Sequence, residues 1–129
     1  MPEAGKEDAQ LLVQLARLGA DMNLADANGF LWSGEFVVDY DEFKRKFPSG
    51  SDGARHVGSI AGFYETVATL VKNELISAEL IHDWPGSDLV WRRLEKILVG
   101  QREESREPRL WENFEALATA RAAKAAAVG

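Results

Sequence analysis

The sequence contains no cysteine, and it also lacks several other features that would mark a special class of protein. Without cysteine there is no disulfide framework, no thiol chemistry and no cysteine-based metal centre. The formal net charge is −6, which would repel a phosphate backbone, so we expect no nucleic-acid partner. No apolar run approaches the ~18 residues of a membrane span, and the N-terminus is acidic where a signal peptide would be basic. These absences predict a soluble, cytoplasmic protein without a membrane span.

The pattern that remains is helical, and its strongest part predicts a central helix over 55–75. Apolar residues recur there at three- and four-residue intervals, which places them on one helix face. They are Val57, Ile60, Ala61, Tyr64, Val67, Ala68, Val71 and Leu75. Gly58 and Gly62 lie on the opposite flank, where we expect another backbone to approach closely.

Around the central helix, the 129 residues predict an all-α single domain of five or six helices. Two further helices are expected over 6–22 and 35–47, and a short one begins after a cap at Ser77. Another runs from the Pro85-Gly86 turn to about 104. The last helix has Pro108 in its first turn. Val37 and Val38 leave a strand as the alternative for the start of 35–47. Asn28-Gly29 predicts a turn that interrupts any helix. We expect 1–5 and about 120–129 to fray and 48–53 to form a flexible loop.

A calcium loop is the most specific metal pattern in the chain, but it is incomplete. Within 24–35, four residues match positions of an EF-hand loop: Asp26, Asn28, Gly29 and Glu35. Leu24 occupies the first ligand position, where the loop needs a carboxylate. A plain link between two helices is therefore the preferred interpretation, and calcium binding is the alternative.

A second metal pattern is the Glu-x-x-His unit formed by Glu79 and His82. Helical di-iron sites use two such units together with further glutamates, and this chain has a single one. A histidine at this position more often lies at the C-terminus of a helix. Because no catalytic set is complete either, we predict no catalytic residue, no metal site and no cofactor.

Glu65 is the polar residue that most needs an explanation, because it borders the apolar face of the central helix. A carboxylate in such a place needs a partner, and Lys72 and Arg102 are the candidates. We expect Arg102 to form a structural ion pair with it. With Glu115, these residues make a possible functional or structural polar cluster. The cluster also supports an alternative function, a small-ligand-binding protein or enzyme with a polar pocket between the central and C-terminal helices.

Large aromatic residues are the basis of the leading functional hypothesis. A possible interface or groove is formed by Tyr64, Trp84, Trp91, Trp111 and Phe114. Tryptophan and tyrosine are enriched among the residues that dominate the binding energy of protein interfaces. We therefore expect a non-enzymatic protein-interaction or regulatory module that binds an unknown protein partner or itself. The alternative is that these side chains belong to the core.

Three segments of the chain resemble a family of proteins: FYETVATLVKNELISAELIHDW, VWRRLEKILVGQRE and EPRLWENFEALA. In order and spacing they are similar to an uncharacterised bacterial family of small helical proteins, classed as a domain of unknown function. The resemblance covers about 40–118, with Glu74 in place of an expected glycine. It implies an all-α fold whose core or groove includes Glu65, Arg102 and Asn113-Phe114-Glu115, and it implies no activity. The resemblance also implies an N-terminal membrane helix in many members, and we expect none in this sequence.

Overall fold

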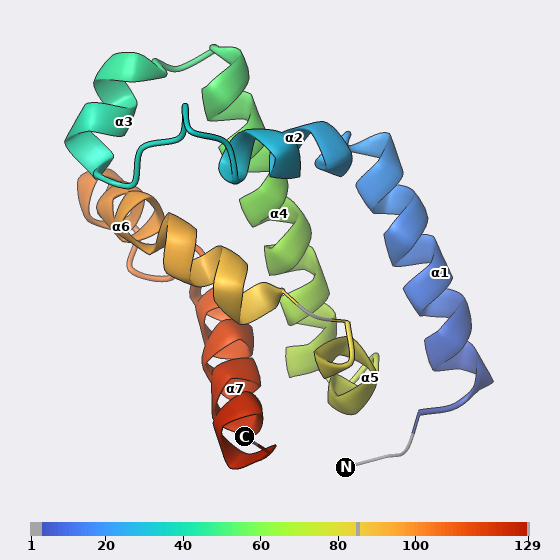
Figure 1. The fold of residues 1–129 in the computed structure, drawn as a ribbon. Helices are drawn as coiled ribbons and strands as arrows, with labels where there is room; N and C mark the ends of the chain where they lie inside the picture. The colour runs from blue at the N-terminus through green and yellow to red at the C-terminus, as the bar shows by residue number, and fades with distance from the viewer. Residues whose placement is uncertain (1–3, 85, 129) are drawn as a thin grey trace.

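The computed structural model describes residues 4–84 and 86–128, and within these ranges the regular elements are all helices (Figure 1). They are α1 (Lys6–Asp21), α2 (Leu24–Leu31), α3 (Tyr40–Lys46), α4 (Asp52–Lys72), α5 (Ala78–His82), α6 (Ser87–Ser105) and α7 (Glu112–Val128). The predicted all-α single domain is confirmed, with seven described helices in place of five or six. Residues 1–3 and 129, from the ends expected to fray, and Pro85, from the expected turn, lie outside the described residues.

Helix α4 is the centre of the domain, as the apolar pattern predicts. It runs through the molecule with α2 packed against one part of it and α7 against another (Figure 1). Its inward face is buried at Val57, Ile60, Ala61, Val67 and Ala68. Burying a valine or isoleucine side chain contributes roughly 1.5–3 kcal/mol, so this face is a main source of stability.

Buried side chains form two apolar clusters that share α4 and α7. The larger cluster joins α2, α3, α4, α6 and α7, and Phe114 of α7 lies fully buried within it. The smaller cluster joins α1, α4, α5 and α7, with Leu117 as the contribution of α7. Tyr64 packs against both clusters. Helix α7 therefore takes part in the whole core, so the way in which it is held matters for the entire fold.

The turn predicted at Asn28-Gly29 is wrong, because both residues lie inside α2. Helix α2 buries Ala27 and Leu31 completely, in the same cluster as the inward face of α4. Glycine weakens a helix by about 1 kcal/mol relative to alanine and asparagine by less, and burial on α4 outweighs that cost. Helix α2 therefore continues through the position of the expected turn.

The helix predicted over 35–47 begins later, at Tyr40. The side chain of Asp39 caps it, accepting a hydrogen bond from the Glu42 amide at 3.0 Å. Residues 36–38 form neither a helix nor a strand, so the strand alternative is also wrong. Phe36 is buried in this segment, which shows that a single aromatic anchor can place a link without regular structure.

The last helix also begins later than predicted, at Glu112 and not around Pro108. Arg106 and Trp111 have left-handed backbone angles, with φ of 58° and 63°, which no continuous right-handed helix can contain. Residues 106–111 therefore turn the chain between α6 and α7. Helix α7 then continues to Val128, and the fraying expected beyond about 120 stays a prediction.

The close backbone approach predicted at Gly58 and Gly62 is wrong. A Cβ atom at either position would meet no atom of the described residues within 4 Å, so this flank of α4 is open. Packing requires glycine at two other positions: a Cβ atom at Gly100 of α6 would collide with the ring of Tyr40, and one at Gly53 of α4 would collide with the ring of Phe47. The glycine pair one turn apart on α4 is thus not a helix-packing motif.

Candidate functional site

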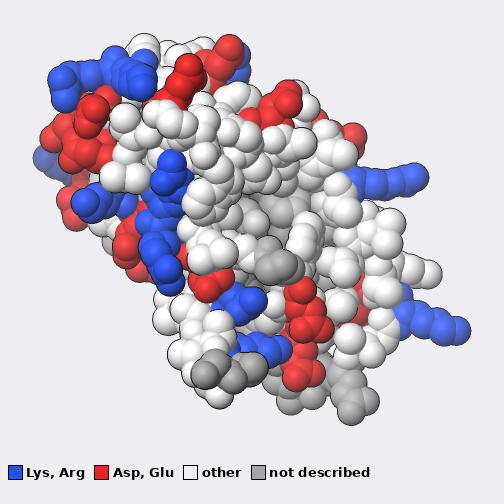
Figure 2. Space-filling view, viewed as in Figure 1, with Lys and Arg blue, Asp and Glu red and all other residues white. Residues whose placement is uncertain are grey.

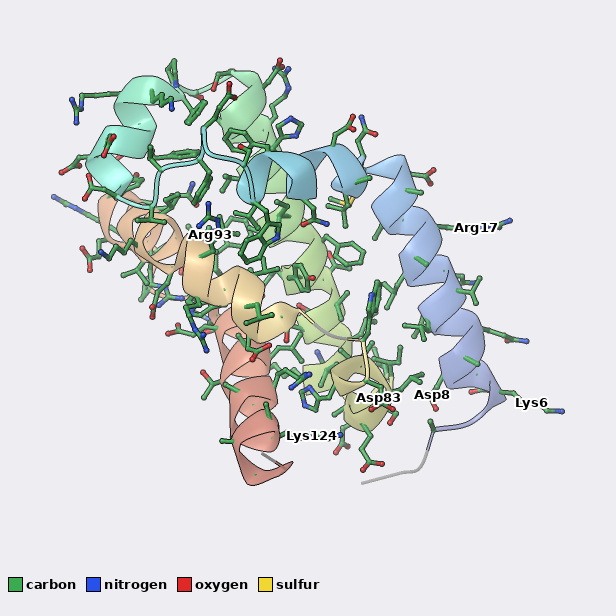
Figure 3. The ribbon with its side chains drawn as sticks, in the orientation of Figure 1. Lys6, Asp8, Arg17, Asp83, Arg93 and Lys124 are labelled. Atoms are coloured by element: carbon green, nitrogen blue, oxygen red, sulfur yellow. The ribbon has the colours of Figure 1, made fainter. Side chains whose placement is uncertain are left out.

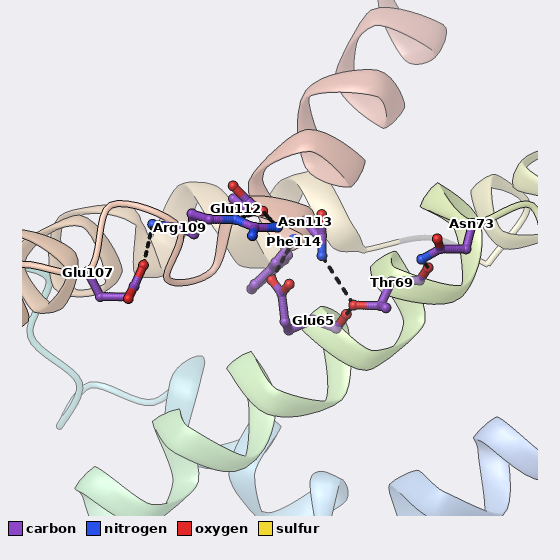
Figure 4. A network of polar contacts seen from close by, with 8 residues as sticks. All are labelled: Glu65, Thr69, Asn73, Glu107, Arg109, Glu112, Asn113 and Phe114. Atoms are coloured by element: carbon purple, nitrogen blue, oxygen red, sulfur yellow. Dashed lines mark hydrogen bonds and ion pairs between the residues drawn. The ribbon is translucent and has the colours of Figure 1, made fainter.

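The polar residues expected to form a cluster surround the first turn of α7. Glu65 reaches across from α4, and its Oε1 atom accepts a hydrogen bond from the Phe114 amide at 2.9 Å (Figure 4). One turn along α4, the Thr69 hydroxyl accepts a hydrogen bond from Asn113 Nδ2 at 3.2 Å. Trp111, the residue immediately before α7, cannot cap the helix with its own side chain, because an indole donates hydrogen bonds but does not accept them. The carboxylate of Glu65 therefore acts as the helix cap, supplied by another helix.

The ion pair expected between Glu65 and Arg102 is wrong, because Arg102 pairs with Glu115. Arg102 Nη1 lies 2.9 Å from Glu115 Oε1, and Arg102 Nε donates a hydrogen bond to the Leu110 carbonyl at 2.9 Å. The same guanidinium thus holds the loop before α7 and the first turn of α7. The three residues do gather in one place, and their contacts there are those of a clamp on α7.

The five aromatic residues expected at an interface lie in very different environments. Phe114 is 0 % exposed and Trp91 is 7 % exposed, so neither offers surface to a partner in this conformation. Tyr64 stacks on Phe114 with ring centroids 5.0 Å apart, and burial raises the pKa of the Tyr64 hydroxyl. Trp111 is half-buried. Trp84 alone among the five is exposed, at 37 %.

Trp84 lies in an apolar groove between α1 and α5. The groove has a volume of about 480 Å³ and is lined by Leu12, Val13, Ala16, Leu80, Asp83 and Trp84. Val13 is 61 % exposed at its edge. The Trp84 ring also packs edge-on against Phe63, at 5.7 Å between centroids, so the indole is held in a defined orientation. A rigid, partly exposed tryptophan is the kind of residue that anchors a binding partner.

The walls of this groove are fixed to each other by Asp8 of α1. One oxygen of its carboxylate accepts a hydrogen bond from the Gly5 amide, and the other accepts one from the Ser77 amide, each at 2.8 Å. Ser77 in turn caps α5, as predicted, by accepting a hydrogen bond from the Leu80 amide at 3.3 Å. Leu15, on the inner face of α1, is buried. The two helices therefore have a set spacing, and the groove between them is part of the fold.

Two basic side chains of α1 point away from this groove, whereas Asp8 reaches across to α5. Figure 3 shows Lys6 and Arg17 extending from the outer side of α1, with Asp83 on the side of α5. Figure 2 shows a mainly uncharged surface between α1, at the right of the view, and the acidic side chains over α5. Sequence reasoning identified Trp84 but missed Val13 and Leu12. The available signal was Val13 itself, an apolar residue outside the buried face of α1.

The calcium-like stretch does not have the geometry of a calcium loop. Asp26, Asn28 and Gly29 lie in α2, whereas an EF-hand needs these positions in a turn that folds around the ion. His82 is the last residue of α5, as its position in the sequence predicts. Within 4–84 and 86–128, no three acidic or histidine side chains gather in a way that could hold a metal ion.

The described residues define a small all-α domain with an apolar groove at one side and a polar clamp around α7. No helix within the described ranges has both the length and the apolar character needed to cross a membrane. The chain belongs to the DUF4760 family, a domain of unknown function, whose family model matches residues 31–121. No curated protein and no solved structure matches the chain significantly.

One wall of the groove between α1 and α5 lies inside the region that the family model matches, and the other wall lies outside it. Leu80 and Trp84 lie inside the matched region, whereas α1, with Leu12 and Val13, precedes it. The segments that carry the resemblance, 63–84, 90–103 and 107–118, all lie inside the match. The bacterial origin that the resemblance implies stays a prediction.

Proposed function

We propose that this chain is a cytoplasmic, non-enzymatic protein-interaction module that binds an amphipathic helix of a partner protein in the groove between α1 and α5. The observation that carries the proposal is the pairing of an exposed apolar edge at Val13 with an oriented, exposed Trp84. Proteins commonly present a hydrophobic groove of this kind to a partner helix, which inserts side chains spaced three and four residues apart.

The shape and charge of the groove favour a helix with basic residues beside its apolar face. Leu12 and Ala16 are one turn apart on α1, so they form a ridge along the groove against which a second helix can pack. Asp83 is the charged residue of the lining, and the whole chain carries a net charge of −6. An excess of negative charge accelerates association with a basic partner and disfavours acidic ones.

The polar cluster supports a small-ligand or catalytic function at the same residues less well. The carboxylates of Glu65 and Glu115 are already engaged with the Phe114 amide and with Arg102. A general acid or base must be free to exchange a proton with a substrate. The clamp therefore explains these residues without a reaction.

The proposal is tested by placing a charge in the groove and, as a matched control, elsewhere. Val13→Glu puts a carboxylate at the groove edge, and Val38→Glu makes the same change at an apolar residue that is 42 % exposed and does not line the groove. Partners captured by the tagged wild-type protein from its source organism are identified, and their affinities for the purified variants are then measured by calorimetry. We expect Val13→Glu to weaken a helical partner by about tenfold or more and Val38→Glu to leave it unchanged.

Equal affinity of both variants for every partner would refute the groove as the binding surface. Thermal unfolding of each variant shows whether the fold is retained, since both positions are exposed. Light scattering provides the remaining outcome. A wild-type dimer that Val13→Glu converts to a monomer would mean that a second copy of the chain, and not a different protein, occupies the groove.

A further inference from the structure

The outer face of α6 is open to solvent, and its charges are divided between its two halves. Five residues recur on it at three- and four-residue intervals, so they form one stripe along the helix: Leu89, Arg92, Lys96, Val99 and Glu103. All of them are exposed except Val99, which is half-buried. The basic residues of the stripe lie in the first half, and its carboxylate lies near the end. None of these three charged side chains forms an ion pair with another residue that the structure describes.

The basic half of this face has an apolar edge that Arg93 holds in place. Leu89 is 49 % exposed, and Trp32, at the end of α2, is 54 % exposed. One turn along α6 from Leu89, the guanidinium of Arg93 lies 5.2 Å from the centroid of the Trp32 ring. Arg93 also donates hydrogen bonds to the carbonyls of Leu31 and Ser33, and Figure 3 shows it on the side of α6 that faces the end of α2. The exposed indole therefore has a defined orientation.

The other half of the face contains a hollow between α6 and the start of α3. The hollow has a volume of about 530 Å³, and Val99 and Gly100 are its apolar lining. Its charged lining is mainly acidic, because four carboxylates and one lysine surround it: Asp39, Asp41, Glu95, Glu103 and Lys96. Figure 2 shows basic side chains over the first half of α6, while acidic side chains are more frequent toward its other end, at the left of the view.

A face with opposite charges at its two ends is complementary to itself when it is turned round. A twofold axis that crosses α6 near Lys96 relates Arg92, four residues before it, to the level of Gly100, four residues after it. Arg92 of one copy then lies over the hollow of the other copy. Glu103 of that copy is three residues further, about 4.5 Å along the helix, which an arginine side chain can span. Because the axis relates the two copies, each contact occurs twice.

We propose that a second copy of this chain binds to this face, with the two α6 helices antiparallel. Arg92 pairs with Glu103 of the second copy, and Leu89 and Trp32 supply apolar contact area beside the charges. A partner with one sign of charge would be attracted by one half of the face and repelled by the other, whereas a second copy matches both halves.

The net charge of −6 opposes self-association only weakly. At physiological ionic strength, exposed charges more than about 8 Å apart are largely screened from each other. The charges that meet within the interface therefore decide the balance. The face is separate from the groove between α1 and α5, so it adds a binding surface to the proposed function.

Sedimentation equilibrium of the full chain tests this proposal. We expect the wild type to dimerise with a Kd of about 100 µM or tighter. Arg92→Glu and Glu103→Arg should each weaken the dimer by about tenfold or more, because like charges then meet twice across the axis. Arg17→Glu makes the same change of charge at an exposed residue of α1, and it should leave the dimer unchanged.

The two substitutions should rescue each other, which tests the antiparallel arrangement directly. A chain that carries both Arg92→Glu and Glu103→Arg again brings opposite charges together across the axis, and so does an equal mixture of the two single variants. We expect both samples to dimerise within about threefold of the wild-type affinity. A monomeric wild type, single variants that dimerise as the wild type does, or a failure of both rescues would overturn the proposal. Thermal unfolding checks that each variant keeps its fold, since both positions are exposed.

The outcome can be separated from that of the proposed protein partner. Val13→Glu should dimerise as the wild type does, because Val13 lies on α1 and outside the α6 face. Loss of the captured partner by Val13→Glu, with the dimer retained, would support the two surfaces separately. A Val13→Glu chain that is monomeric would instead place the second copy in the groove between α1 and α5, and the proposed α6 interface would be refuted.

Discussion

Replacing Glu65 by alanine removes the cap that α4 supplies to the first turn of α7. The Phe114 amide then loses its acceptor, the Glu65 Oε1 atom at 2.9 Å. Loss of an N-cap costs about 0.5–2 kcal/mol, and an amide left unpaired in a half-buried place costs about 1–3 kcal/mol. These costs overlap, because they describe the same hydrogen bond. We expect Glu65→Ala to lower the free energy of unfolding by about 1.5–3 kcal/mol.

Glu65→Gln separates the hydrogen bond from the charge. A glutamine oxygen can still accept from the Phe114 amide, so only the attraction between the carboxylate and the helix N-terminus is lost. That attraction is typically about 0.3–1 kcal/mol at a partly exposed site. The expected order of stability is therefore wild type, Glu65→Gln and Glu65→Ala. Urea unfolding followed by tryptophan fluorescence measures all three, with the exposed Glu95→Ala on α6 as the control.

Hydrogen exchange gives the site-specific test. The Phe114 amide should exchange faster in Glu65→Ala, while amides in the middle of α6 should change only as far as the global stability does. A double-mutant cycle adds a second test, since Arg102 pairs with Glu115 and not with Glu65. Glu65 and Arg102 should therefore couple by less than about 0.5 kcal/mol. Wild-type stability of Glu65→Ala, or strong coupling to Arg102, would refute the capping account.

Three further results are expected. Gly62→Ala should stabilise the protein by up to about 1 kcal/mol, because the added methyl group enters open space. Gly100→Ala should destabilise it by about 1–3 kcal/mol, because the added methyl group collides with an aromatic ring. Chemical unfolding measures both, and a change in the free energy of unfolding with the same sign for the two variants would refute the packing described. Phe114→Ala should cost about 3–5 kcal/mol in the same assay, since the ring is fully buried, and a cost below about 1 kcal/mol would contradict that burial. Burial lowers the pKa of His82 in the folded state from its ordinary 6.5, so the contribution of this residue to stability is present above about pH 6.5 and is lost as the pH falls through the folded pKa. His82→Gln should remove this pH dependence. If the free energy of unfolding of His82→Gln varied with pH as that of the wild type does, the expectation would be contradicted.

The helices that can be predicted from sequence are those whose pattern is local and strong. Helix α4 is the clearest case, because its buried face is written into one stretch of chain with regular spacing. The cap at Ser77 was likewise predictable, since capping involves residues only three apart. Helix α2 was not, because its stability depends on the burial of Ala27 and Leu31 within a core formed with distant segments.

The candidate sites show the same division. The residue types were evident from the chain: a carboxylate at Glu65 that needs a partner, and a tryptophan at Trp84 suited to a surface. Which partner Glu65 finds depends on where the turn at 106–111 places the first amides of α7, 49 positions along the chain at Phe114. Whether an aromatic residue is core or surface depends on which helices cover it, as the burial of Phe114 and the exposure of Trp84 demonstrate.

The sequence by itself determined that this chain folds as one all-α domain around α4, because periodic apolar residues specify helices and their inward faces through short-range geometry. The tertiary structure decided the rest: the clamp on α7, and the exposure of Val13 and Trp84 between α1 and α5. Each depends on side chains far apart in sequence that meet only after the helices have packed, and no local pattern records that meeting.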